Sequence, residues 1–332
     1  MIKITKLQET ETVYDINVAN NHNFYANNIL VHNCMESYSI FDEETTHTCN
    51  LLSLVHPYIS DDELESVTRD AVDLLDLTVD ISIPPIKKSI KHNKDIRAIG
   101  LGSMGLDDWR AYNNISWYKD TDIDKIMQRF EKIAYYAIHQ SSLNGKELGS
   151  FGRFKESEWS KGNMLGRTLE EIQRNSKTDL DWAALSEMVK ISMRNGWLLA
   201  IAPNTTSSSA IGVTSSILPT YSKSFIEETK VGNIPRMPLY IEERPLGYIA
   251  YSDMDMFHLN TIIGGIQFWT DAGISYEPLF DLNKDENRSA RRIMEFYIDA
   301  WKKGVKGIYY IRWIKPGTKT ITDKEECLGC AG

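Results

Sequence analysis

Apolar residues recur at helical spacing in several stretches after residue 60. Ser60 and Glu63, three positions apart, form a capping box, and apolar positions one helical face apart follow them. Gly145 stands just past the end of another long amphipathic pattern, where a helix commonly stops. These patterns predict helices over residues 64–78, 122–143, 181–194, 254–269 and 289–303.

Short apolar runs between the helical stretches, notably 197–202 and 307–312, read as strands and indicate an α/β body. The first 33 residues differ in character. From Thr12 to Asn33, β-prone runs alternate with asparagines, and residues 27–28 are placed as a two-residue hairpin turn. A segment this small cannot bury enough apolar surface to fold alone, so we expect it to complete another folding unit.

Composition narrows the class of protein. The 332 residues include 37 Lys+Arg and 46 Asp+Glu, a net charge of −9, which argues against broad binding to nucleic acid. No apolar stretch reaches the roughly 18 residues of a membrane span, and no targeting peptide is visible, so we expect a cytoplasmic protein. Four cysteines are too few for a disulfide framework, so each thiol needs its own explanation.

The tripeptide His32-Asn33-Cys34 carries a recognisable chemistry. The Asn33 side-chain amide can attack its own carbonyl carbon and cleave the following peptide bond. His32 can supply the proton that activates that carbonyl, and Cys34 is a nucleophile able to accept an acyl group as a thioester. Alone, the tripeptide is better explained as a chance sequence.

This segment resembles the C-terminal half of a split intein. The matching pieces are VYDINV, HNF and ILVHN followed by Cys34, and they cover nearly all of residues 1–33. The resemblance gives Asp15 and His22 supporting roles in acyl shift and Asn33 cyclisation. It also implies a second polypeptide that carries the N-terminal intein half.

The body contains motifs that are ambiguous singly. Residues 100–105, GLGSMG, match G-x-G-x-x-G, but no strand with an acidic residue follows, so we interpret the glycines as permitting a tight turn. Cys327 and Cys330 are too few to form a zinc site by themselves, and we interpret them either as a mobile dithiol or as an inert tail; we expect no metal site in this chain.

Tyr309 and Tyr310 are interpreted either as packing residues on a buried strand or as a stacked pair that relays an electron and a proton.

A hydroxyl-rich turn follows the apolar run WLLAIA. It is either an anion site at a helix start or an ordinary helix cap. Its residues are Pro203, Asn204, Thr205, Thr206, Ser207 and Ser208.

Taken together, residues 34–332 resemble the C-terminal part of the large subunit of class I ribonucleotide reductase. The matching pieces are CMES, CNLLSL, RAIGLGSMG, MRNGWLLAIAPNTTSS, GIYYIRW and ECLGC. The implied fold is the C-terminal half of a ten-stranded α/β barrel, preceded by the all-β intein fragment at residues 1–33 and ending in a flexible redox tail at about 314–332.

The resemblance implies a role for each matched residue. Cys34 becomes the thiyl radical that takes the ribose 3′ hydrogen, Glu36 the base at the 3′ hydroxyl, and Cys49 one of two reducing thiols. Tyr309 and Tyr310 relay the radical from a metal cofactor in a small subunit. The tail dithiol re-reduces the active-site disulfide and is itself reduced by thioredoxin or glutaredoxin, while the 203–208 turn holds the substrate diphosphate.

The second reducing cysteine, the allosteric nucleotide sites and the first half of the barrel precede Cys34 in the family, so we expect them on the partner chain. Asn33 belongs to the intein and is not assigned the family's substrate-binding asparagine. The expected function is a precursor that splices in trans into a complete reductase large subunit. The alternatives are a cobalamin-dependent reductase, which needs no tyrosine relay, and a non-catalytic remnant that only associates with its other half.

Overall fold

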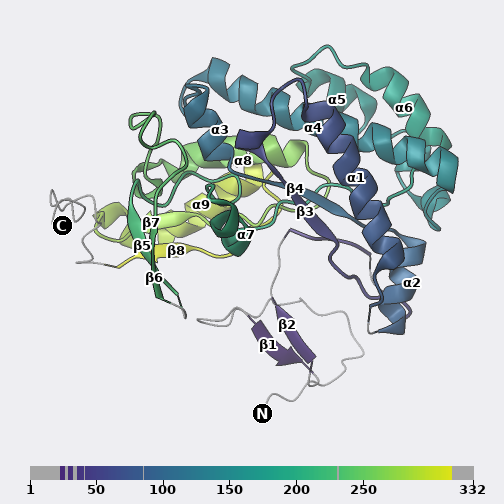
Figure 1. The fold of residues 1–332 in the computed structure, drawn as a ribbon, viewed down its shortest axis with the longest axis horizontal. Helices are drawn as coiled ribbons and strands as arrows, with labels where there is room; N and C mark the ends of the chain where they lie inside the picture. The colour runs from purple at the N-terminus through teal and green to yellow at the C-terminus, as the bar shows by residue number, and fades with distance from the viewer. Residues whose placement is uncertain are drawn as a thin grey trace. The chain divides into compact units, whose positions relative to one another are not determined.

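The computed structural model describes residues 23–26, 29–32, 36–40, 42–84, 86–229 and 232–315, and the chain divides into two units, residues 1–34 and 35–332. In the first unit, β1 (Asn23–Ala26) pairs antiparallel with β2 (Ile29–His32). Ala26 lies opposite Ile29, which leaves two residues for the connection, as the sequence predicts (Figure 1).

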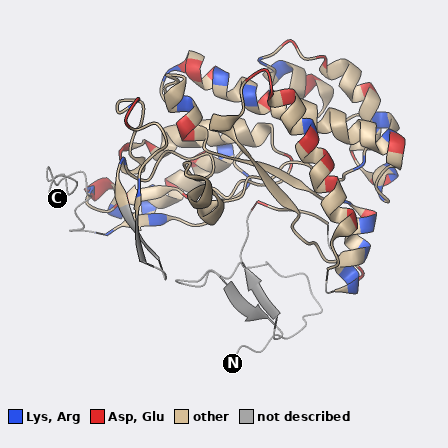
Figure 2. Ribbon diagram, in the orientation of Figure 1, with Lys and Arg blue, Asp and Glu red and all other residues tan. Residues whose placement is uncertain are grey.

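In the second unit, chain segments far apart in sequence pair in parallel. β3 (Leu51–Val55) pairs with β4 (Gly100–Met104), and Leu101 in turn bridges to Leu199. The same pattern continues from Ile201 to Ile274 and from β7 (Leu279–Asp281) to β8 (Arg312–Ile314). Neither β3 nor β4 carries a charged residue, whereas acidic and basic residues are interspersed along the helices (Figure 2).

The parallel pairs do not close into a barrel within the described part of the chain. The prediction of half a ten-stranded barrel therefore stands only as an α/β body with parallel pairing. A separate antiparallel pair is formed by β5 (Phe225–Thr229) and β6 (Gly232–Arg236). Ile314 is the last residue of β8, and residues 316–332, which make up nearly all of the expected redox tail, lie outside the described residues.

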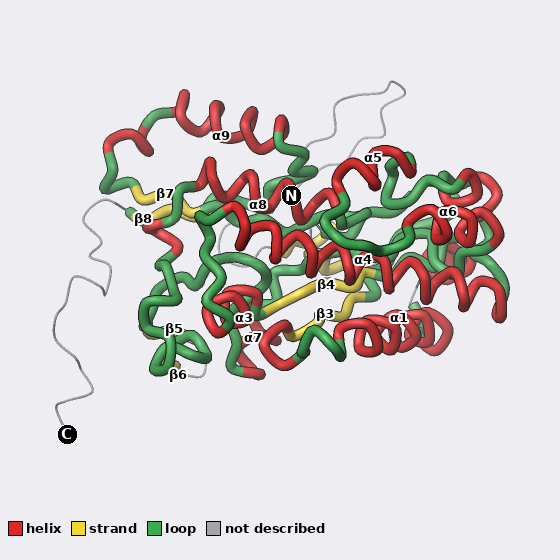
Figure 3. Tube along the Cα trace, turned by 90° about the horizontal axis from the view of Figure 1, so that it is seen from above, coloured by secondary structure: helices red, strands yellow, loops and turns green. Residues whose placement is uncertain are grey.

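Helices cover the strands (Figure 3). The α-helices are α1 (Leu64–Ile81), α2 (Lys87–Asp95), α3 (Leu106–Tyr112), α4 (Asp120–Leu148), α5 (Leu169–Asn175), α6 (Trp182–Ile191), α7 (Thr205–Ile211), α8 (Met256–Phe268) and α9 (Ala290–Lys302). Short 3-10 turns lie at His56–Tyr58, Phe154–Glu156, Trp159–Lys161, Tyr251–Asp253 and Asp285–Arg288. α4 packs against α1, α6 and α8, and α9 packs against α8. No helix in the described ranges has the length and apolar character needed to cross a membrane.

The five predicted helices are confirmed, with one difference at α4. Gly145 lies inside this helix, which continues to Leu148 and ends at Gly149, where φ is 91°. The glycine at 145 serves packing, because a Cβ there would come within 2.8 Å of the backbone of Met193 and Arg194. A close approach of two backbones excludes a side chain as firmly as a turn does.

At the start of α1, Ser60 and Glu63 bond reciprocally. The Ser60 Oγ donates to Glu63 Oε2 at 2.6 Å, and the Glu63 N–H donates back to Ser60 Oγ at 3.3 Å. The predicted pair is therefore present, one turn ahead of the regular helix.

Three interpretations of the body need correction. Residues 197–202 form only isolated bridges, and Tyr309 and Tyr310 precede β8 instead of lying on a buried strand. Residues 100–104 of the glycine motif form β4, and only Gly105, with φ of 73°, makes the turn into α3. A Cβ on Gly102 would come within 2.5 Å of the Ala200 carbonyl oxygen, so this glycine permits close pairing with the 199–201 segment.

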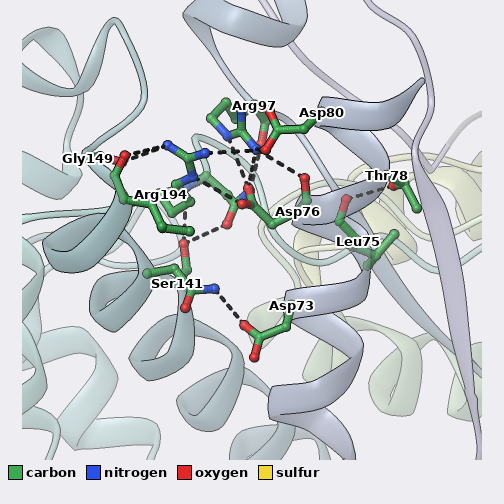
Figure 4. A network of polar contacts seen from close by, with 12 residues as sticks. Asp73, Leu75, Asp76, Thr78, Asp80, Arg97, Ser141, Gly149 and Arg194 are labelled. Atoms are coloured by element: carbon green, nitrogen blue, oxygen red, sulfur yellow. Dashed lines mark hydrogen bonds and ion pairs between the residues drawn. The ribbon is translucent and has the colours of Figure 1, made fainter. Parts of the chain in front are cut away.

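A buried polar network ties α1 to the parallel segments (Figure 4). The Asp76 carboxylate accepts from Arg97 Nη2 at 2.8 Å, from Arg194 Nε at 3.0 Å and from Asn195 Nδ2 at 2.9 Å. Ser141 of α4 donates to the Asn195 side chain at 2.9 Å. Arginines from two of the sequence motifs therefore have structural partners here.

Candidate active site

A cavity of about 350 Å³ lies between α7 and the segments that lead to β7 and β8. Pro203, Thr205 and Ser208 line it on the α7 side. Ser275, Glu277 and Arg312 line it from the parallel segments. The cavity thus places the predicted phosphate turn close to Arg312, which follows the predicted relay residues Tyr309 and Tyr310 in the chain.

The turn itself is fixed through Asn204. This residue has φ of 56°, its Oδ1 accepts from Ser53 Oγ at 3.1 Å, and its Nδ2 donates to the Ser103 carbonyl at 3.2 Å. Its side chain makes no cap on α7 because it is engaged with β3 and β4, so it does not satisfy the first N–H groups of that helix. Free N–H groups at a helix start favour an anion.

Glu36 is buried and held at two points beside the cavity. The N–H of Gly273 donates to its backbone carbonyl at 2.6 Å, and the Ser275 hydroxyl donates to its carboxylate Oε2. Ser275 also lines the cavity. One hydroxyl therefore connects the predicted general base with the space that a ligand would occupy.

Cys49 is exposed and forms no disulfide. Neighbouring protein atoms desolvate one side of its thiol and raise its pKa, a hydrogen bond with Ser37 lowers it, and the nearby charge of Glu36 raises it. Ser37 Oγ also lies 2.6 Å from Nε2 of His47. Burial, with a smaller effect of His92, lowers the pKa of His47 to about 4, so this imidazole is neutral at pH 7.

Tyr309 and Tyr310 form a ring pair, with centroids 4.7 Å apart and planes inclined at 54°. Arg312 Nη2 donates to the Tyr310 hydroxyl at 2.7 Å and pairs with the Glu277 carboxylate at 2.6 Å. Burial and then the charge of Glu277 raise the pKa of Tyr310, against a lowering by Arg312. Both rings are half-buried, and Tyr310 is hydrogen-bonded to two residues that line the cavity.

Several predicted residues cannot be placed. Asp15, His22, Asn33, Cys34, Cys327 and Cys330 lie outside the described residues. His32 is the last residue of β2, and its side chain is not among those described. Their roles stay predictions.

The sequence reasoning missed the residues that join these parts. Arg312 stands inside the GIYYIRW motif, so a charged residue in an otherwise uncharged run with two tyrosines was an available signal. No such signal marked Ser275 and Glu277 in the sequence, because their hydrogen-bond partners Glu36 and Arg312 are 239 and 35 positions away.

Comparison with known proteins gives consistent results. A family model described as the ribonucleotide reductase barrel domain matches residues 11–311, a range that begins inside the segment likened above to an intein half. A ribonucleoside-diphosphate reductase subunit alpha from Synechocystis sp. is 34% identical over 310 residues, covering 90% of this chain and 40% of that protein.

A protein of the same name from Helicobacter pylori is 35% identical over 297 residues, covering 86% of this chain and 37% of its own length. Another from Chlamydia muridarum is 29% identical over 322 residues, covering 84% and 31%. The chain thus spans two fifths or less of the length of these relatives.

Proposed function

The chain belongs to the ribonucleotide reductase large-subunit family, and we propose that it supplies the C-terminal part of a class I enzyme reducing ribonucleoside diphosphates to deoxyribonucleotides. The observation that carries this proposal is the cavity, which is shared by Ser275, Glu277 and Arg312. Of these lining residues, Ser275 is hydrogen-bonded to Glu36, and Arg312 is hydrogen-bonded to Tyr310. A radical reductase needs a base and a radical relay to converge on one substrate.

In the proposed reaction, the Cys34 thiyl radical takes the 3′ hydrogen of the ribose while Glu36 takes the 3′ hydroxyl proton. The 2′ hydroxyl leaves as water with a proton from one of the two reducing thiols, and at the end Cys34 returns the hydrogen to C3′ and regains its thiyl radical. Cys49 and a second cysteine, on the part of the enzyme that this chain lacks, supply two electrons and end as a disulfide. Cys327 and Cys330 reduce that disulfide by thiol exchange, and thioredoxin or glutaredoxin reduces them in turn.

The Tyr309–Tyr310 pair is proposed to carry the radical between a small subunit and Cys34. The metal cofactor of that small subunit supplies the oxidising equivalent, and this chain is not proposed to bind it. The hydrogen bond from Arg312 supports a relay, because it fixes the Tyr310 hydroxyl while leaving its proton to move toward another acceptor. This feature favours class I over the cobalamin-dependent alternative, which has no use for such a pair.

Replacing Tyr310 by Phe in the assembled enzyme tests the relay. We expect deoxyribonucleotide formation to be abolished, because phenylalanine has no proton to release on oxidation. Tyr297→Phe on the exposed side of α9 is the matched control and should retain turnover. Normal turnover by the Tyr310→Phe enzyme would refute the relay.

We further propose that residues 1–33 act as an intein half. The ordered pieces VYDINV, HNF and ILVHN support this, together with Cys34 directly after Asn33. A partner's upstream segment would be transferred to the Cys34 thiol as a thioester, and Asn33 would cyclise and release residues 1–33. The freed Cys34 amine would then take the acyl group from sulfur, which forms the peptide bond and restores the thiol. Cys34 would then serve first as an acyl acceptor and later as the radical carrier.

Mixing this chain with a polypeptide that bears the N-terminal intein half and reductase part tests the splicing step. Mass spectrometry should show residues 34–332 joined to the partner's upstream segment and residues 1–33 freed. An Asn33→Ala chain should stop before release. If wild-type chains give no ligated product, the splicing proposal fails while the reductase proposal survives.

A further inference from the structure

One wall of the cavity has no assigned role. It is the segment 213–220, which follows α7 and lines the cavity at several positions, Ser216 among them. Ser216 is 3% exposed and has φ of 54°, a left-handed conformation that non-glycine residues rarely adopt. A strained backbone of this kind persists only where the surroundings impose it, and such positions cluster at ligand sites.

The Ser216 hydroxyl is also unsatisfied. Within the described part of the chain its Oγ is buried and has no hydrogen-bond partner. Buried polar atoms almost always have one, since leaving them unpaired costs free energy. Because Ser216 is a residue of the cavity lining, its buried and unpaired hydroxyl is suited to a partner that arrives with a ligand.

Two adjacent carboxylates hold this wall at its two ends. The Asp108 Oδ2 accepts from the Thr214 N–H at 2.6 Å, and the Asp107 Oδ2 accepts from the Thr220 N–H at 2.8 Å. Both aspartates are fully buried on α3, directly after the Gly105 turn. Asp107 is further fixed by Arg110 and Trp117, so Ser216 lies between two rigid anchors.

The charge of the cavity indicates the class of ligand. Arg236 and Arg312 both line it, and a guanidinium stays charged at any physiological pH. Among the described residues that line it, Glu277 is the one acidic residue, and it is paired with Arg312. The carboxylates of Asp107 and Asp108 do not line the cavity, and each is taken up by donors.

We propose that residues 213–220 form a second substrate-binding wall, on which the Ser216 hydroxyl donates a hydrogen bond to a phosphate oxygen of the nucleoside diphosphate. This inference rests on the proposed function and adds a contact to those of the 203–208 turn. Asp107 and Asp108 are positioning residues that act through Ser216.

The test uses the full 332-residue chain with inorganic pyrophosphate as the probe, its dissociation constant measured by ³¹P NMR titration. In a Ser216→Gly chain we expect binding about tenfold weaker, the effect of one hydrogen bond to a charged acceptor. The thermal midpoint of unfolding should stay level or rise, because glycine accepts a positive φ without strain. Asn114 is exposed and also has a positive φ, of 55°, so Asn114→Gly is the control for the backbone change and should leave pyrophosphate binding unchanged.

The positioning role is tested by a double-mutant cycle. Asp107→Asn should weaken pyrophosphate binding in the wild-type background and have little further effect in the Ser216→Gly background. Equal effects in both backgrounds would overturn the positioning role. A parallel titration with cytidine identifies the contact, since a loss confined to the nucleoside would overturn the phosphate assignment.

Thr205→Val separates this inference from the proposed function. If Thr205→Val weakens pyrophosphate binding and Ser216→Gly does not, the second wall is refuted and the phosphate turn stands. If the wild-type chain binds no pyrophosphate, both the turn and the wall fail as phosphate sites.

Discussion

The Asp76 network and the cavity are both polar clusters at the parallel segments, yet they differ in how completely their groups are paired. Asp76 and Arg97 are 5% and 7% exposed, and each is held by several hydrogen bonds. At the cavity, Arg312 is 39% exposed and the buried Ser216 hydroxyl has no partner in the described residues. A polar group that stabilises the fold typically has all its hydrogen-bond partners within the protein. A polar group that binds a ligand typically lacks some of them until the ligand is bound.

The comparison predicts its largest effect at Asp76. Replacing it by Ala leaves the Arg97 guanidinium and the Asn195 amide buried without their shared acceptor. We expect the free energy of unfolding to fall by about 3–5 kcal/mol, the usual cost of breaking a buried pair from one side. Urea unfolding of the whole chain, followed by circular dichroism, measures it.

Asp80 provides the matched control for Asp76. It also bonds to Arg97, at 2.7 Å, but its side chain is 51% exposed. Asp80→Ala should therefore cost less than about 1 kcal/mol. Similar losses for the two variants would show that burial does not distinguish them and would remove the basis of the comparison.

A smaller loss of stability is expected on the cavity side. Glu277→Gln removes the charge that pairs with Arg312, but water reaches that guanidinium and Gln keeps an acceptor oxygen. The free energy of unfolding should fall by about 1 kcal/mol in the same urea assay. Glu286→Gln, at an exposed residue near β7, should change nothing measurable. A loss as large as that of Asp76→Ala would place Glu277 among the structural groups.

Local sequence signals were sufficient for five of the helices and for the hairpin. Apolar periodicity found α1, α4, α6, α8 and α9. All of these except α8, where only Thr261 is exposed, bury one face, and such a pattern needs no knowledge of distant partners. The strands were harder. The run 197–202 is apolar and buried, yet it makes only isolated bridges, a matter of pairing geometry that composition does not encode.

The candidate site divides along the same line. Glu36 and Cys49 were predicted from motifs, whereas Ser216, Asp107 and Asp108 were not singled out. Charged residues at a helix start ordinarily read as a solvated cap, and the partners of these aspartates stand more than 100 positions away, at 214 and 220. Such groups become visible only once the chain is folded.

The smallest expected effect concerns Cys49, where pairing tunes reactivity instead of stability. Its raised pKa means that the thiol is protonated at pH 7, so alkylation by iodoacetamide should accelerate only above the usual thiol range near pH 8.5. Ser37→Ala removes the hydrogen bond that lowers this pKa, so the midpoint should move higher and the rate at pH 8 should fall about threefold. Ser39→Ala is the matched control, because Ser39 bonds to His92 instead. Peptide mapping by mass spectrometry measures the alkylation of Cys49 separately from that of the other thiols. An unchanged pH midpoint of alkylation in Ser37→Ala would show that this serine does not affect the pKa of the thiol.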